Sequence, residues 1–221
     1  MEMIYMQSVK KFNTQSLGEE IANAVSHGVG SLLSIAACVI VIVRAAFEST
    51  AIGVVSASIY GASLILLYTF SSLYHSLTNF KAKSVFQIFD HCSIFFLILG
   101  TYTPICLAMI RGAMGWTLFG INTFCTVVGI TFNAINVKRF HKMSMVLYIL
   151  MGWSVLISIK RVIEITPFSG MIFLVTGGLL YTIGIVFYKM KSVKYMHFVW
   201  HLFVLAGSIL HYFFVLFYVF K

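Results

Sequence analysis

Charged side chains are scarce in this sequence. Only 10% of its 221 residues are Asp, Glu, Lys or Arg, whereas 60% are hydrophobic. A soluble domain carries about 25% charged residues, because its whole surface must be hydrated. The shortage of charge therefore excludes a soluble globular protein and predicts an integral membrane protein.

Proline and long polar segments are also rare. The sequence has two prolines, and its 16 glycines fall largely within long apolar runs. A membrane β-barrel would show segments of about ten residues with alternating apolar and polar side chains, and no such segments occur. The apolar runs therefore predict an all-α membrane protein, and the short polar stretches between them leave no room for an extramembrane domain.

Acidic residues are few, and the cysteines have no metal-binding spacing. The cysteines lie singly in apolar spans, which indicates small core residues rather than a disulfide or thiolate site. They are Cys38, Cys92, Cys106 and Cys125. The net charge is +9, from 15 Lys and Arg against 6 Asp and Glu. These basic residues lie in short loops, where the positive-inside rule and anionic lipids account for them, so no nucleic-acid partner is expected.

Seven apolar spans, each with the ~20 residues needed to cross a bilayer, follow one another along the chain. They are predicted at residues 18–44, 50–75, 85–110, 114–136, 143–163, 170–189 and 195–220. Ser16-Leu17-Gly18-Glu19 fits a capping box at the start of the first. The sequence therefore predicts a seven-helix transmembrane bundle over residues 18–221, preceded by a short cytoplasmic segment at 1–17 and no cleavable targeting peptide.

The distribution of Lys and Arg predicts the orientation of the bundle. With the N-terminus inside, ten of them fall in cytoplasmic segments and five in outside segments. The ten are Lys10, Lys11, Lys81, Lys83, Lys138, Arg139, Lys142, Lys189, Lys191 and Lys194, and the five are Arg44, Arg111, Lys160, Arg161 and Lys221. The positive-inside rule therefore favours a cytoplasmic N-terminus and an outside C-terminus.

Ionisable groups inside a membrane are costly and are functional candidates by default. The candidates are His27, His75, Asp90, His91, His197, His201 and His211, and Asp90 is the only aspartate in the chain. The predicted topology places the end of the second span and the starts of the third and seventh at the cytoplasmic side. His75, Asp90, His197 and His201 therefore fall in one layer.

The spacing within this layer predicts a zinc site. His197 and His201 are one helical turn apart, which lets one helix offer two imidazoles to a metal, and Ser71 and His75 share that spacing. Three histidines with an open position are typical of catalytic zinc. Asp90 is then either a fourth ligand or, preferably, a general base beside a zinc-bound water, whose pKa zinc lowers toward ~7. Ser71 is placed to stabilise a developing oxyanion or to orient the water.

The remaining histidines are interpreted as structural, because a lone intramembrane histidine usually forms an interhelical hydrogen bond. His211 lies ten residues beyond His201, and hence ~15 Å along the helix, too far to share the site. His91 points about 100° away from Asp90 and is second-shell or structural. Glu20 and His27 share one helix face and either line the cavity or, preferably, form a helix-packing polar pair. His141 lies in the basic loop predicted at residues 138–142 and is expected to be solvated.

At these residues the sequence resembles the bacterial hemolysin III proteins of the larger progestin and adipoQ receptor family. The matching segments are Glu19 to Asn23 with Ser26-His27-Gly28, Ser71 and His75, Phe89-Asp90-His91, Gly100 to Pro104, and His197 and His201. The resemblance implies a seven-helix bundle with zinc near the cytoplasmic face, bound by His75, His197 and His201 and by Asp90 through water. The serine matching Ser71 belongs to a motif set shared with alkaline ceramidases, which are membrane amide hydrolases.

Three functions follow as hypotheses. The first is a zinc-dependent hydrolase of the bacterial cytoplasmic (inner) membrane that acts on a lipid amide or ester. The second is a non-enzymatic sensor or regulator of lipid homeostasis with a structural zinc, and the third is a cytolysin. A retinal protein is excluded, because the last span has no interior lysine to form a Schiff base.

Overall fold

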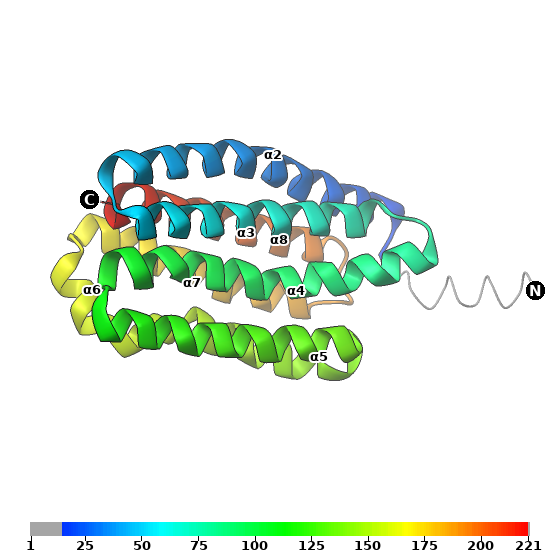
Figure 1. Ribbon diagram of the computed structural model, residues 1–221. Helices are drawn as coiled ribbons and strands as arrows, with labels where there is room; N and C mark the ends of the chain where they lie inside the picture. Colours follow the sequence, from blue (N-terminus) through cyan, green and yellow to red (C-terminus); the bar gives the residue numbers. More distant parts are fainter. Residues whose placement is uncertain (1–14, 221) are drawn as a thin grey trace, which may run out of the picture.

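The computed structural model describes residues 15–220, and this part of the chain is helical without any strand. Figure 1 shows the helices packed side by side along one common direction. They are α2 (Leu17–Glu48), α3 (Ala51–Ser76), α4 (Phe80–Pro104), η1 (Ile105–Ile110), α5 (Gly112–Gly152), η2 (Ser154–Ser158), α6 (Ile159–Ile165), α7 (Phe168–Lys189), α8 (Met196–Phe214) and η3 (Val215–Val219). Most of the predicted 1–17 segment, and Lys221, lie outside the described residues.

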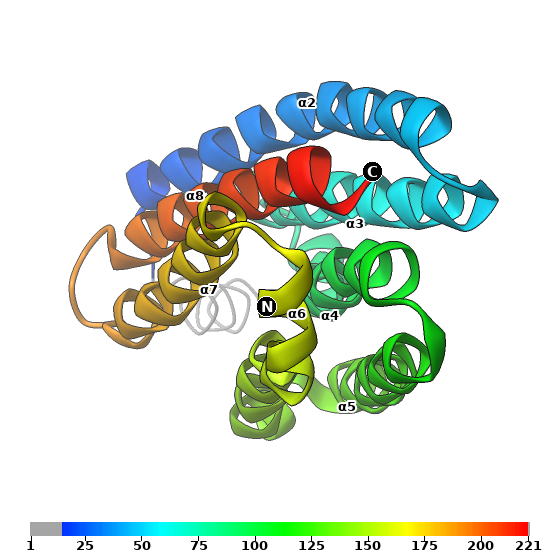
Figure 2. The same cartoon turned by 90° about the vertical axis from the view of Figure 1, so that its left-hand side faces the viewer.

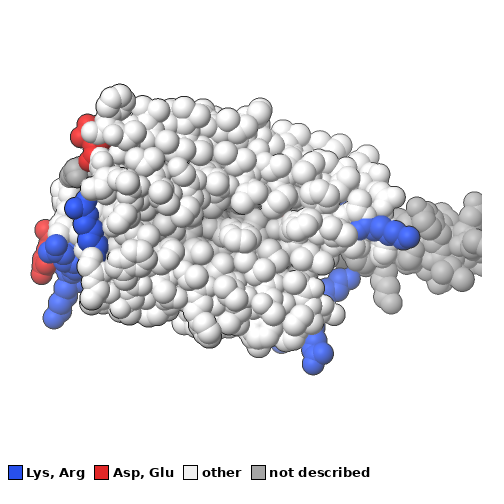
Figure 3. Space-filling model, viewed as in Figure 1, with Lys and Arg blue, Asp and Glu red and all other residues white. Residues whose placement is uncertain are grey.

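The surface of the bundle confirms a membrane protein. Within residues 15–220, six helical stretches are long and apolar enough to span a bilayer. Large apolar side chains point outward along their length, among them Leu32, Phe47 and Phe124. Figure 3 shows charged groups gathered at the two ends, with a broad uncharged band between them. Such a band fits the hydrocarbon layer of a membrane, where apolar side chains face lipid.

The longest element, α5, doubles back on itself at Asn136. The backbone of Asn136 is extended (φ −167°, ψ 100°) between two helical segments. Asn122 Nδ2 donates to Ser154 Oγ over 2.9 Å, although the two residues are 32 positions apart. A straight helix would separate them by ~48 Å. Figure 2 shows the two segments of α5 lying side by side.

The turn differs from the loop that was predicted at residues 138–142. That loop is wrong, because all of 137–152 is helical. Asn136 Oδ1 accepts a hydrogen bond from the Arg139 backbone N–H at 2.9 Å, so one asparagine caps the second segment. Asparagine is a preferred N-cap residue for this reason.

Local capping sets the other helix boundaries. The capping box at the start of α2 is confirmed, with Glu19 N donating to Ser16 Oγ at 3.4 Å and Ser16 N donating to Glu19 Oε2 at 2.8 Å. The third span begins at Phe80, five residues earlier than predicted, because Asn79 Oδ1 accepts from the Ala82 N–H. After Pro104, which has no N–H to donate, the same span continues as the π-helix η1.

Polar contacts bind the helices to one another inside the bundle. Tyr68 of α3 and Tyr181 of α7 both reach Ser208 Oγ of α8 at 2.7 Å. The helices pack closely at these contacts, because a Cβ added at Gly207 of α8 would lie 3.0 Å from the ring of Tyr181. The four cysteines are free thiols. Figure 1 places the α3–α4 turn, the bend of α5 and the α7–α8 turn at the end where the described chain begins.

Candidate metal centre

Three histidines meet at that end of the bundle. His75 lies in the last turn of α3, and His197 and His201 lie in the first turns of α8. One ring nitrogen of each histidine lies within 4.8 Å of those of the other two. Within residues 15–220, this is the only group of three or more His, Cys, Asp or Glu side chains close enough together to hold a metal ion. His75 and His201 are buried and His197 is half-buried. We call this group the histidine trio.

The Nε2 atoms of the trio have no partner in the described part of the protein. All three are buried and make no hydrogen bond. An unsatisfied buried polar atom costs about 1–3 kcal/mol, so three in one place need an explanation. A metal ion among them would accept all three lone pairs. Three neutral imidazoles fit zinc, which takes His nitrogens in catalytic sites that keep a fourth position open.

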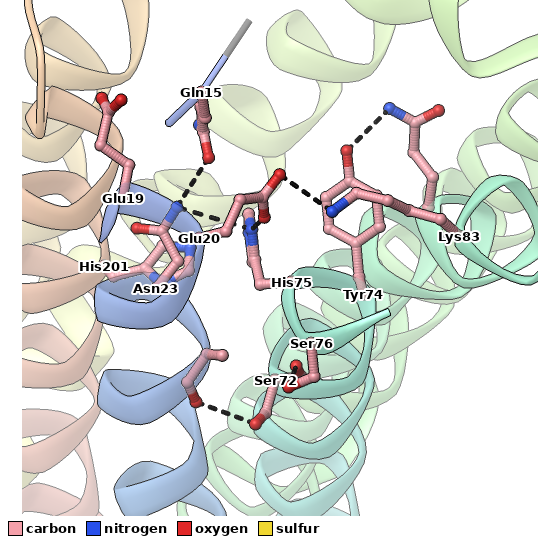
Figure 4. A network of polar contacts seen from close by, with 12 residues as sticks. Gln15, Glu19, Glu20, Asn23, Ser72, Tyr74, His75, Ser76, Lys83 and His201 are labelled. Atoms are coloured by element: carbon pink, nitrogen blue, oxygen red, sulfur yellow. Dashed lines mark hydrogen bonds and ion pairs between the residues drawn. The ribbon is translucent and has the colours of Figure 1, made fainter. Parts of the chain in front are cut away.

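Outer contacts turn two of these rings toward the centre. His75 Nδ1 lies 2.7 Å from Glu20 Oε2 (Figure 4). A carboxylate only accepts, so His75 donates from Nδ1 and its Nε2 keeps a lone pair. Ser26 Oγ lies 3.3 Å from His201 Nδ1 and itself donates to the Asn23 carbonyl. The serine oxygen therefore accepts from Nδ1, and His201 Nε2 is also free to bind a metal. Hydrogen bonds to the nitrogen that does not bind the metal orient metal-binding histidines in general.

One face of α2 carries residues that contact the trio from outside. Glu20, Asn23 and His27 follow each other at i, i+3 and i+7. Glu20 and His27 both pack α2 against other helices, as the preferred interpretation predicts, but each does so through partners of its own. Glu20 binds His75 and Lys83, at 2.7 and 2.9 Å. The ring of His27 stacks on that of His201 instead, with centroids 3.6 Å apart.

Asp90 lies beside a cavity and is not part of the trio. The cavity has a volume of about 160 Å³ and a mainly apolar lining, contributed mostly by α4, α5, α7 and α8 with one residue each from α2 and α3. Asp90 and His27 both line it, and Asp90 is 8% exposed. His27 also stacks on His201, which places the cavity next to the trio. Ser71 lies one turn before His75, and its buried Oγ has no partner among residues 15–220.

The other histidines occupy separate places. His211 Nε2 lies 3.1 Å from the Leu174 carbonyl and joins α8 to α7. His91 and His141 have ring centroids 6.3 Å apart, and both line the cavity. The expectation that His141 is solvated is wrong, because its ring is half-buried and packs 5.6 Å from that of Tyr188. The cause is the helical geometry of residues 137–152, which turns this side chain inward.

The fold and these contacts define a class: a multi-pass helical membrane protein with a buried cluster of three histidines at one end. The family described as "Haemolysin-III related" matches residues 15–212, and the chain belongs to this family. It is 45% identical to "Hemolysin-3" of Bacillus cereus over 93% of this chain and 94% of that protein. It is 43% identical to the "Hemolysin-3 homolog" of Bacillus subtilis, over 93% of this chain and 97% of that protein. A more distant relative is the human "Monocyte to macrophage differentiation factor", 25% identical over 72% of this chain and 68% of that protein.

Proposed function

We propose that this protein crosses the bacterial cytoplasmic membrane seven times, with its N-terminus inside and its C-terminus outside. The bend at Asn136 supports seven crossings, because it divides the stretch Gly112–Ile165 into two antiparallel passes. The trio end of the bundle carries Lys81, Lys138, Arg139, Lys142 and Lys191, and the positive-inside rule makes such an end cytoplasmic. The trio then lies near the cytoplasmic face.

The trio is proposed to hold one zinc ion. The single observation that carries this proposal is that three histidines bring ring nitrogens within 4.8 Å of one another while each has a buried Nε2 with no partner within residues 15–220. The contacts of Glu20 and Ser26 with the opposite ring nitrogens support it, since they present these lone pairs to one centre. Zinc is preferred to harder ions because imidazole nitrogen suits it, whereas Mg²⁺ and Ca²⁺ prefer oxygen.

The reaction proposed is hydrolysis of a lipid amide or ester. Zinc on three histidines, when bound, supplies a Lewis acid that makes water a nucleophile near neutral pH. The remaining catalytic roles fall to residues of this chain. Asp90, in the cavity, takes up the proton from the attacking water, and the Ser71 hydroxyl donates to the developing oxyanion. The apolar lining of the cavity receives the acyl chain and excludes bulk water.

A regulatory protein with a structural zinc is the alternative that the same geometry leaves open. In that protein, zinc bound by the trio would link α3 to α8 and stabilise the fold, and no reaction would be catalysed. A cytolytic function is a further candidate, and the name "Hemolysin-3" of the Bacillus cereus relative favours it. Steady conductance from the purified protein in planar bilayers would support a pore. The absence of conductance across several lipid compositions would exclude a pore.

Chelation distinguishes the hydrolase from the structural alternative. We expect purified protein in nanodiscs to cleave a member of a panel of N-acyl and O-acyl lipids, to lose this activity when zinc is removed, and to regain it when zinc returns. The melting temperature is measured on the same samples. A large fall in melting temperature with no hydrolysis at any stage would favour the structural zinc and contradict the hydrolase.

A further inference from the structure

A lysine, a glutamate and a histidine from three helices form one continuous polar chain at the edge of the trio. Lys83 Nζ of α4 lies 2.9 Å from Glu20 Oε1 of α2, and Glu20 Oε2 lies 2.7 Å from His75 Nδ1 of α3. Figure 4 shows the Glu20 carboxylate between its two partners. Oε1 of the Glu20 carboxylate therefore binds Lys83, and Oε2 binds His75.

The burial of Lys83 sets it apart from the other basic residues that the structure describes at this end. Lys83 is 7% exposed, whereas Lys81, two residues earlier on the same helix, is exposed. The Lys83 ammonium also lies 5.1 Å from the ring centroid of Tyr74. Removing a charge from water is unfavourable, and a buried ion pair is weak evidence for stability in itself. The membrane topology needs a positive charge at this end, but it does not need that charge to be buried.

The geometry gives the buried lysine a specific task. A glutamate has three rotatable side-chain bonds, and His75 alone would leave its second oxygen free to turn. With Lys83 bound to Oε1, the carboxylate is held so that Oε2 meets His75 Nδ1. That contact in turn presents His75 Nε2 to His197 and His201. Lys83 and Asp90 are also seven residues apart on α4 and therefore share one face of that helix.

We propose that Lys83 is a positioning residue for the metal centre and acts through Glu20. This inference rests on the metal centre proposed above. Second-shell partners of metal-binding histidines typically change metal affinity by about 10- to 100-fold when removed. A lysine that only joined α4 to α2 would change the stability of the fold and leave the affinity of the assembled site unaltered.

The test compares metal affinity across a set of variants of the full-length protein in detergent. The variants are K83M, E20Q, the double variant, K83R and, as the exposed control, K81M. Zinc dissociation constants come from competition with a chelator, and the visible spectrum of the Co²⁺-loaded protein reports ligand geometry. Thermal melts show which variants are folded.

We expect E20Q and K83M each to weaken zinc binding by about 10- to 100-fold and to alter the cobalt spectrum. The double variant should bind no more weakly than E20Q, because Lys83 acts through the carboxylate. K83R should recover part of the affinity, and K81M should match the wild type. Wild-type affinity and spectrum in K83M would overturn the proposal, as would independent losses that multiply in the double variant. A wild-type protein that binds neither metal would instead overturn the metal centre itself.

Discussion

Replacing His201 by alanine will leave the purified protein without stoichiometric zinc. His201 is fully buried, one of its ring nitrogens lies within 4.8 Å of those of His75 and His197, and its ring stacks on His27. The variant keeps two of three protein ligands and opens a void beside them. A site with two imidazoles has lost the ligand set on which protein zinc sites are built. We expect metal analysis to show a fall from about one zinc per chain to near zero.

His211→Ala is the matched control for this variant. His211 lies on the same helix and loses a hydrogen bond to the Leu174 carbonyl, but it does not belong to the trio. It should therefore lower the melting temperature while zinc stays at the wild-type ratio. Zinc retained in His201→Ala, or lost equally in both variants, would contradict the assignment of the trio as the ligand set.

Asp90→Asn is expected to separate metal binding from turnover. Asp90 lines the cavity and lies outside the trio, so the variant should keep its zinc. Asparagine has nearly the same shape but cannot accept a proton. Loss of a general base typically lowers rates by about 10²- to 10⁴-fold, and we expect a fall of that order in lipid hydrolysis. The measurement pairs zinc content with turnover on whichever acyl lipid the wild type cleaves.

Glu164→Gln provides the control for Asp90→Asn. Glu164 is an exposed acid in α6, at the other end of the bundle, where it pairs with Arg161 at 3.5 Å. Its loss should leave turnover unchanged. Full activity in Asp90→Asn would remove Asp90 from the reaction, and loss of zinc in that variant would make it part of the metal site.

Much of the fold could be predicted from the sequence, because apolar length and capping are local signals. The span predicted at 50–75 corresponds to α3 (Ala51–Ser76), and the box at Ser16 and Glu19 begins α2. The loop at 138–142 was wrong because its cluster of basic residues suggested solvent. A single capping residue, Asn136, makes the turn instead. Basic side chains can lie on a helix at a membrane surface as readily as in a loop.

Only those features of the site that follow from residue spacing within one helix and from the membrane topology could be predicted from the sequence. The i,i+4 spacing of His197 and His201, together with the charge asymmetry, placed them in one layer with His75, and the structure brings the three together. The roles of Glu20, Ser26 and Lys83 were missed, because each depends on a contact between helices. The spacing of Glu20, Asn23 and His27 on one face of α2 was the available signal. It indicated a polar face but not its partners.

Zinc K-edge X-ray absorption on the purified wild-type protein tests the central claim most directly. The account predicts about one zinc per chain, with three imidazole nitrogens at about 2.0–2.1 Å and no sulfur ligand. Protein that carries no zinc, or zinc bound by fewer than three imidazoles or by a cysteine sulfur, would contradict it.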